Sequence, residues 1–159
     1  MAPIKLDIQH FDCGDDDLND FLKNDAIYYT ENNLAVTYLA ADGNKVVSYM
    51  SLAIGAIEVK KHLFEKDIDP RARIRYYPCL KIARLATDKR YHGKGYAAEM
   101  IYLAVTIAKE IRKRAGCKFL MVDAYSDSKV INWYKKRGFV TPYSEFKGMN
   151  TVPMYLILE

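Results

Sequence analysis

The sequence is poor in cysteine. Its three cysteines, Cys13, Cys79 and Cys117, are odd in number, and no two of them have Cys-x-x-Cys spacing. We therefore expect neither a disulfide framework nor a zinc site. Reduced cysteines are typical of the cytosol, so the expected location of the protein is cytoplasmic.

Long hydrophobic runs are missing as well. No apolar stretch approaches the roughly 20 residues that a membrane helix needs, and residues 1–10 lack an apolar core of signal-peptide length. No membrane partner is expected. The consecutive acids Asp15, Asp16 and Asp17 lack the alternation of a calcium-binding loop, so no metal ion is expected either.

What the chain does contain fits one folded domain. It has 159 residues, of which 50% are hydrophobic and 28% are charged. A chain of this length suits a single domain over residues 1–159. The formal net charge is +4. That charge is compatible with an anionic cofactor or an RNA partner, but an ordinary surface with a lysine excess accounts for it equally well.

Hydrophobic periodicity predicts an α/β protein with a mixed sheet of about seven strands and flanking helices. The Asp42-Gly43 pair predicts a hairpin turn. Strand 78–87, helix 97–114 and strand 119–124 predict a central, right-handed βαβ crossover. The other predicted strands span residues 4–8, 34–41, 46–55 (extended by 57–59), 139–140 and 154–158; the other predicted helices span residues 15–30 and, after a cap at 126–128, the stretch up to 137.

Residues 60–77 differ in character from the rest of the chain. They contain six basic side chains and Pro70, and they show little apolar periodicity. This pattern predicts a long loop with a short helical turn near residues 61–65. Long ordered loops in compact domains are often functional. A mobile connector with surface lysines explains the composition equally well.

The residues between strand 78–87 and helix 97–114 are the first candidate for a binding site. The sequence there reads Arg90-Tyr91-His92-Gly93-Lys94-Gly95-Tyr96-Ala97. Glycines allow a tight turn and a close approach of the backbone to a ligand. The first N–H groups of the helix point outward at the positive end of its dipole. A phosphate or pyrophosphate fits such a turn, although two glycines alone are equally consistent with a turn that binds nothing.

Together with a second motif, this turn resembles the acetyl-CoA loop of the Gcn5-related N-acetyltransferases (GNAT). The loop motif of that family, Arg/Gln-x-x-Gly-x-Gly/Ala, is matched by Arg90, Gly93 and Gly95. Further downstream, the last motif of the family is matched by Tyr134 followed by Gly138-Phe139. The order of the expected elements over the whole chain also agrees with this family.

The resemblance implies an acyltransferase that uses acetyl-CoA to acetylate a primary amine. Backbone N–H groups of the turn would hold the pyrophosphate, and the end of strand 78–87 would offer an N–H to the thioester oxygen. Tyr134 would be the catalytic acid that protonates the leaving sulfur. The residues that the resemblance assigns to the coenzyme are Leu85, Ala86, Thr87, Arg90, Tyr91, His92, Gly93, Lys94, Gly95, Tyr96 and Ala97.

A finer resemblance in the N-terminal half is to the toxin-type branch of the same family. It is carried by Phe11-Asp12-Cys13-Gly14 and by the segments 48–53 and 82–86. It implies that the acceptor is the amino acid on charged tRNA and that a ribbon-helix-helix antitoxin is a partner. A small-molecule amine or protein N-acetyltransferase and a non-catalytic acyl-CoA-binding regulator stay open as alternatives, as does a homodimer.

The sequence does not single out a general base or an RNA-binding surface. Glu58, Glu99 and His92 are conceivable bases, and each has an ordinary structural explanation. The residues that would meet an RNA acceptor, or else form ordinary surface, are Arg71, Arg73, Arg75, Arg84, Lys135, Lys136 and Arg137, with Tyr76 and Tyr77 as rings on which a base could stack.

Overall fold

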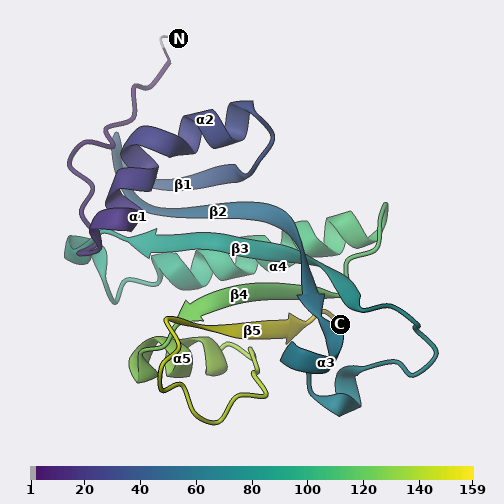
Figure 1. Cartoon of the computed structure of the whole chain (residues 1–159). Helices are drawn as coiled ribbons and strands as arrows, with labels where there is room; N and C mark the ends of the chain where they lie inside the picture. Colours follow the sequence, from purple (N-terminus) through teal and green to yellow (C-terminus); the bar gives the residue numbers. More distant parts are fainter. Residues whose placement is uncertain (1–2) are drawn as a thin grey trace. The chain divides into compact units, whose positions relative to one another are not determined.

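The computed structural model describes residues 3–159, in which helices pack with a five-stranded sheet (Figure 1). The strands follow the order β1-β2-β3-β4-β5 in the sheet. The strands are β1 (Val36–Asp42), β2 (Lys45–Glu58), β3 (Tyr76–Thr87), β4 (Phe119–Tyr125) and β5 (Thr151–Ile157). The helices are α1 (Asp16–Asp20), α2 (Ala26–Glu31), α3 (Val59–His62), α4 (Tyr96–Arg112) and α5 (Ser128–Lys135). Three short helical segments are η1 (Phe21–Asp25), η2 (Glu65–Asp67) and η3 (Lys89–Tyr91).

The α/β class with a mixed sheet is confirmed, but two of the predicted strands are not strands. Residues 4–8 form only an isolated bridge between Asp7 and Lys45. Ile4 and Leu6 are 76% and 39% exposed, and only Ile8 of the alternating apolar residues packs against the buried cluster of this region. Val140 likewise forms only a bridge, with Tyr155. The chain reaches Pro142 two residues later, and proline has no N–H with which to continue the ladder.

Two further differences concern element boundaries, and one predicted strand extension is confirmed. The predicted helix 15–30 is α1, the π-helical turn η1 and α2 in succession. Asp15 caps its start by accepting a hydrogen bond from the N–H of Leu18 at 3.1 Å. The predicted extension of the second strand is real, because β2 runs unbroken to Glu58. The predicted loop 60–77 contains α3 and η2 and ends where β3 begins at Tyr76.

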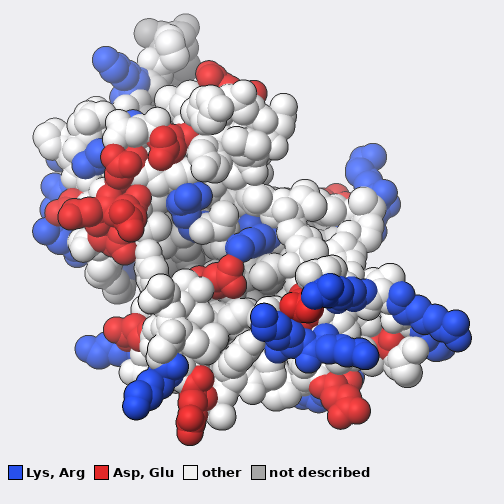
Figure 2. Space-filling model, viewed as in Figure 1, with Lys and Arg blue, Asp and Glu red and all other residues white. Residues whose placement is uncertain are grey.

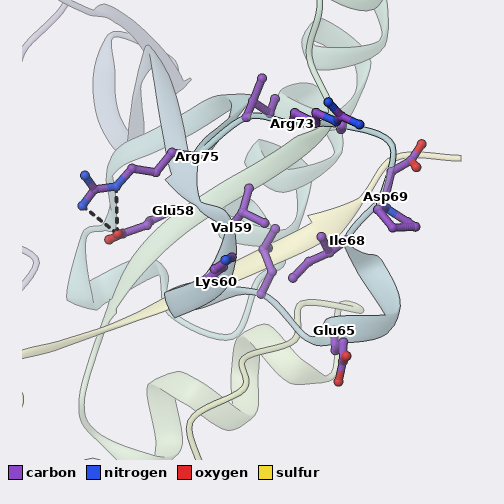
Figure 3. Close-up of a pocket in the computed structure, with 12 residues that line it drawn as sticks. Glu58, Val59, Lys60, Glu65, Ile68, Asp69, Arg73 and Arg75 are labelled. Carbon is purple, nitrogen blue, oxygen red and sulfur yellow. Dashed lines mark hydrogen bonds and ion pairs between the residues drawn. The ribbon is translucent and has the colours of Figure 1, made fainter.

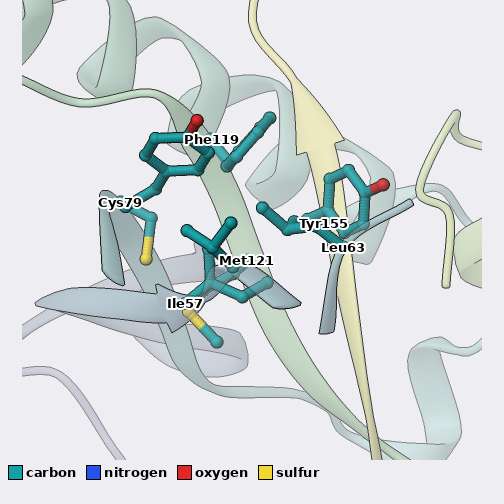
Figure 4. Close-up of a cluster of buried hydrophobic side chains, with 8 residues drawn as sticks. Ile57, Leu63, Cys79, Phe119, Met121 and Tyr155 are labelled. Carbon is teal, nitrogen blue, oxygen red and sulfur yellow. The ribbon is translucent and has the colours of Figure 1, made fainter. Parts of the chain in front are cut away.

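The chain divides into two compact units, each made of two stretches of sequence. The first unit comprises Met1–Ala53 and Ile82–Ala104, and the second comprises Ile54–Lys81 and Val105–Glu159. Each unit has its own buried cluster. That of the first unit is formed by Phe11, Phe21, Leu22, Ala26, Val46, Tyr49 and Ala86. That of the second is formed by Ile57, Val59, Leu63, Tyr77, Cys79, Phe119, Met121 and Tyr155 (Figure 4).

Strand pairing within the units confirms the hairpin and the neighbouring strands of the βαβ crossover. In the first unit, β1 and β2 are antiparallel around a turn in which Gly43 has a φ of +60°. In the second unit, Lys118 N–H donates to the carbonyl of Pro78 at 2.8 Å, and Lys81 pairs with Asp123 at 2.7 Å. A later residue on β3 is thus paired with a later residue on β4, so these two strands are parallel. The pair β4 and β5 is antiparallel.

Among the described residues, no helix combines the length and the hydrophobicity that spanning a membrane requires. All three cysteines are free thiols. Within residues 3–159, no group of three or more His, Cys, Asp or Glu side chains is arranged to hold a metal ion.

Candidate active site

In the first unit the chain forms the strand, glycine turn and helix that the sequence predicts. Strand β3 ends at Thr87, and α4 begins at Tyr96, where Glu99 N–H donates to the carbonyl of Gly95 at 3.0 Å. Gly93 and Gly95 have φ angles of +76° and +89°. These angles are in the left-handed region that side chains disfavour.

The space around the two glycines is open. A Cβ added at Gly93 or at Gly95 would have no heavy atom within 4 Å. Packing inside the protein therefore does not require glycine here, and the backbone angle does. The start of α4 lies directly after this exposed backbone, and helix N-termini favour anions. The residues present thus fit the pyrophosphate of a coenzyme.

Substitution of Gly95 by alanine tests this arrangement. We expect the dissociation constant of acetyl-CoA to rise about tenfold, because a non-glycine residue at this φ costs about 1–2 kcal/mol, so the free turn relaxes to other angles and has to be restored when the coenzyme binds. Isothermal titration calorimetry measures the change. Gly148→Ala is the matched control, since Gly148 also has a positive φ (+79°) and open space but lies in the loop before β5. If both substitutions weaken the binding of acetyl-CoA equally, the turn has no specific role in binding the coenzyme.

A buried carboxylate holds the chain just before the turn. Asp88 follows β3 directly, and its side chain is fully buried. Its two oxygens accept hydrogen bonds from Arg90, at 2.9 Å from Nε and 2.7 Å from Nη2, and from the backbone N–H groups of Arg90 and Asp12. These donors, led by the Arg90 side chain, hold the pKa of Asp88 well below its usual range.

The same network ties the N-terminal segment to the turn. Asp12 forms an ion pair with Lys89 at 2.9 Å, and its other oxygen accepts from Gly14 N–H and from the amide of Asn19. The Lys89 side chain is the main cause that lowers the pKa of Asp12. Lys89 N–H in turn donates to the carbonyl of Asp12 at 2.9 Å. We name Asp12, Asn19, Asp88, Lys89 and Arg90 the clamp.

The side chain of Arg90 is held within the clamp. Its guanidinium is engaged by Asp88 and also donates to the carbonyl of His10 at 2.7 Å. The charge of Arg90 is therefore compensated by a buried carboxylate. Arg90 thus shapes the turn, while the backbone N–H groups of the turn and the side chain of Lys94, which is in no ion pair among the described residues, are placed to meet an anion.

The end of β3 is also fixed by hydrogen bonds. The hydroxyl of Ser48, which is fully buried on β2, donates to the carbonyl of Ala86 and lies 3.0 Å from the hydroxyl of Thr87. His92 Nε2 lies 2.8 Å from the carbonyl of Thr87. His92 is thus engaged at the turn itself, which weakens its case as a general base. Of the other candidates, Glu58 is paired with Arg75 at 3.1 Å and Glu99 is exposed on α4.

Tyr134, the proposed acid, lies in the second unit near the end of α5. Its side chain is 6% exposed and packs edge-on against Trp133 and Phe139, with ring centroids 5.0 and 5.3 Å away. Burial raises the pKa of Tyr134, so the phenol stays protonated. No hydrogen bond of its hydroxyl is found among residues 3–159. Every fully buried side-chain polar atom there has a partner, so this oxygen keeps an open side.

The Gly-Phe pair after α5 positions Tyr134 through the backbone. Phe139 N–H donates to the carbonyl of Tyr134 at 3.2 Å, and this path needs Gly138 at a φ of +90°. A Cβ at Gly138 would also lie 3.1 Å from Leu156. Arg137 stacks on the ring of Trp133 at 3.6 Å and donates to its carbonyl. Both contacts hold Arg137 against α5.

Two further residues of the set considered for RNA contact have packing partners within the protein. Arg84 stacks on the ring of Phe21 at 3.6 Å, inside the first unit. Tyr77 is 3% exposed, packs on Phe119 and accepts a hydrogen bond from Asp69 N–H at 2.9 Å. Both therefore have structural roles. Tyr76 is 47% exposed and has the Arg75 guanidinium 5.3 Å from its ring.

Sequence reasoning missed the clamp. Asp88 stood next to the turn without a distinguishing pattern, and its partner Asp12 is 76 residues away. The segment Phe11-Asp12-Cys13-Gly14 could have pointed to the clamp, because it contains Asp12. From the sequence, this segment supported only the family resemblance, and no physical role was assigned to it.

Comparison with known proteins now identifies the class. Residues 6–139 match the model of the acetyltransferase (GNAT) family. The chain belongs to this family and is an acyltransferase whose acetyl donor is acetyl-CoA.

Similar proteins include a toxin and several solved acetyltransferase structures. The chain is 22% identical over 157 residues to a tRNA-acetylating toxin of Mycobacterium tuberculosis (strain ATCC 25618 / H37Rv), covering 96% of this chain and 85% of that protein. Among solved structures, it is similar to a tyrosine-to-phenylalanine variant of KacT, with a TM-score of 0.84, 23% identity and coverage of 96% and 88%. AtaT complexed with acetyl-methionyl-tRNAfMet gives a TM-score of 0.82, 23% identity and coverage of 99% and 91%.

Proposed function

We propose that this protein transfers the acetyl group of acetyl-CoA to the free amine of the amino acid on charged tRNA. The observation that carries the proposal is the match to a tRNA-acetylating toxin along 96% of the chain. The similarity to AtaT complexed with acetyl-methionyl-tRNAfMet supports it at the level of the fold. Charged tRNA is a substrate of translation, so we propose that the protein acts in the cytoplasm.

The residues of this chain divide the work as follows in the proposal. Backbone N–H groups at Gly93 to Ala97 bind the pyrophosphate, and the clamp keeps that backbone in place. An N–H near the end of β3, at Leu85 to Thr87, polarises the thioester carbonyl. The acceptor amine attacks the carbonyl carbon and the carbon–sulfur bond breaks. Tyr134 gives its proton to the departing sulfur, and the amine loses its proton to solvent.

A regulatory partner is part of the proposal. AtaT has been solved bound to the C-terminus of its antitoxin AtaR, and KacTA has been solved as a complex with DNA. We propose that this chain is likewise paired with an antitoxin of the ribbon-helix-helix type. Co-expression with the gene next to its own, followed by affinity purification, tests for such a partner.

The acceptor is tested with labelled acetyl-CoA. Purified protein is given charged tRNA, uncharged tRNA, polyamines, peptides or aminoglycosides in separate reactions. We expect label on charged tRNA alone, and growth arrest when the protein is expressed. Label on small amines or peptides but not on charged tRNA would replace this function with that of a small-molecule or protein N-acetyltransferase. Binding of acetyl-CoA without transfer to any acceptor would indicate a non-catalytic regulator.

A further inference from the structure

The second unit contains a hollow to which the proposed function assigns no role. Its volume is about 1150 Å³, and its walls come from one continuous stretch, from Glu58 at the end of β2 through α3 and η2 to Arg75 (Figure 3). Binding sites for small ligands are commonly about 300–1,000 Å³. The hollow is therefore large enough for a nucleotide.

The floor of the hollow is apolar. Val59 and Leu63 belong to the buried cluster of the second unit, and Ile68 and Ala72 pack against that cluster. Figure 3 shows Val59 and Ile68 pointing into the hollow. Ile74 also lines it and is 50% exposed. The floor thus offers a surface for a flat, weakly polar group.

Across residues 3–159, the lining side chains that are in no ion pair are two bases, Lys60 and Arg73, and one acid, Glu65. Of the acids that line it, Glu58 is paired with Arg75 at 3.1 Å, and Asp69 is paired with Arg71 at 3.3 Å. Glu65 and Asp69 point away from the hollow in Figure 3. Figure 2 shows basic side chains gathered over α3 and the segment after it.

Hydrogen bonds hold the hollow in shape without a ligand. The hydroxyl of Tyr155 accepts from Phe64 N–H at 3.0 Å and donates to Asp67. The hydroxyl of Tyr77 accepts from Asp69 N–H at 2.9 Å. Both tyrosines are anchored in the buried cluster. The segment is therefore fastened to the core, so little ordering is needed when a ligand binds.

We propose that this hollow binds the single-stranded 3′ end of the RNA acceptor. A base lies on the apolar floor, and Lys60 and Arg73 contact the flanking phosphates. Next to the hollow, Tyr76 is 47% exposed and has Arg75 5.3 Å from its ring, so it offers a stacking surface for a second base. Stacking surfaces combined with cations are the usual means of binding single-stranded RNA. The proposal rests on tRNA being the acceptor.

The test compares binding of intact uncharged tRNA with binding of the same tRNA trimmed of its single-stranded 3′ end. Fluorescence anisotropy is measured for the wild type, Arg73→Ala and Ile74→Ser, over a series of salt concentrations. We expect each substitution to weaken intact tRNA about fivefold or more and to leave trimmed tRNA unchanged. Arg73→Ala is also expected to reduce the slope of log K against log salt by about 1.

Two matched controls lie in the same unit but outside the hollow. Arg114→Ala removes another exposed arginine, and Ile157→Ser removes an isoleucine that is 47% exposed. The proposal is overturned if the controls weaken intact tRNA as much as the test substitutions do. It is also overturned if the test substitutions weaken the binding of intact and trimmed tRNA alike. A third contradicting result is that an acidic peptide binds in the hollow, so that the test substitutions weaken peptide binding, while they leave the binding of RNA unchanged.

Acetylation of methionine methyl ester separates this proposal from the proposed function. The ester carries the reactive amine but no RNA, so Arg73→Ala is expected to acetylate it at the wild-type rate. If the wild type acetylates charged tRNA and the hollow variants use it equally well, the hollow proposal fails and the function stands. If the wild type never acetylates charged tRNA, the function fails whatever the binding data show.

Discussion

Tyr134→Phe is expected to lower kcat by about 100-fold or more while the dissociation constant of acetyl-CoA stays nearly constant. General acid catalysis contributes about 10²–10⁴-fold, and the substitution removes the only proton that the side chain can give. The aromatic ring stays, so its packing against Trp133 and Phe139 is retained. Steady-state kinetics and calorimetry measure the two quantities. An unchanged melting temperature confirms that the fold is intact.

The pH profile gives an independent check on this role. Burial raises the pKa of Tyr134, so the hydroxyl remains a donor throughout the neutral and mildly alkaline range. We therefore expect no loss of kcat from deprotonation of Tyr134 below about pH 10.

Tyr28→Phe, which removes the hydroxyl of a tyrosine that is 58% exposed, is the matched control for Tyr134→Phe. Wild-type kcat in Tyr134→Phe would exclude the phenol as the acid.

The second large effect is expected at the clamp. Asp88→Asn removes a charged acceptor from Arg90 and leaves a buried amide facing a guanidinium. We expect a loss of about 2–3 kcal/mol in the free energy of unfolding at neutral pH. We also expect the dissociation constant of acetyl-CoA to rise about tenfold, because the backbone of the turn loses its support. Urea unfolding and calorimetry measure these changes.

The direction of the pH dependence follows from the lowered pKa of Asp88. A carboxyl whose pKa is lower in the folded state stabilises the fold above its unfolded pKa, about 3.9, and loses that contribution as the pH falls towards the folded value. The difference in stability between wild type and Asp88→Asn is therefore expected to be full at pH 7 and to shrink below about pH 4. A difference that is constant over this range would exclude the carboxylate as its source.

Asp17→Asn is the control for the clamp. Asp17 is an exposed acid in the first turn of α1, so its loss costs only a few tenths of a kcal/mol through the helix dipole. The coenzyme affinity of Asp17→Asn is expected to match that of the wild type. If this variant binds the coenzyme more weakly, the affinity depends on negative charge in the N-terminal segment and not on the geometry of the clamp.

The features that sequence reasoning found are those fixed by local chemistry. The hairpin follows from Asp42-Gly43, and the strand–turn–helix around Gly93 and Gly95 follows from backbone angles that glycine favours. Both depend on residues a few positions apart. Local pattern was insufficient for residues 4–8, because alternation predicts a strand only where one face becomes buried, and Ile4 is exposed.

The features of the site that local pattern did not decide have the same origin. Successive side chains on a strand point to opposite faces, so one of Tyr76 and Tyr77 had to face inward, but their sequence does not say which. Arg84 reads as a free cation until Phe21, far away in the sequence, is found against it. The clamp likewise depends on Asp12 meeting Asp88. All three outcomes are set by tertiary contacts between distant residues.

The most direct test of the account is the position of the acetyl group on the product. Charged tRNA is incubated with acetyl-CoA and the protein and then digested with nuclease, and the released aminoacyl-adenosine is examined by mass spectrometry. We expect a species heavier by one acetyl group, with the group on the amine of the amino acid, and about 100-fold slower formation of it when Tyr134→Phe replaces the wild type. Unmodified aminoacyl-adenosine from the wild type, together with acetylated polyamine or peptide in a parallel reaction, would contradict it.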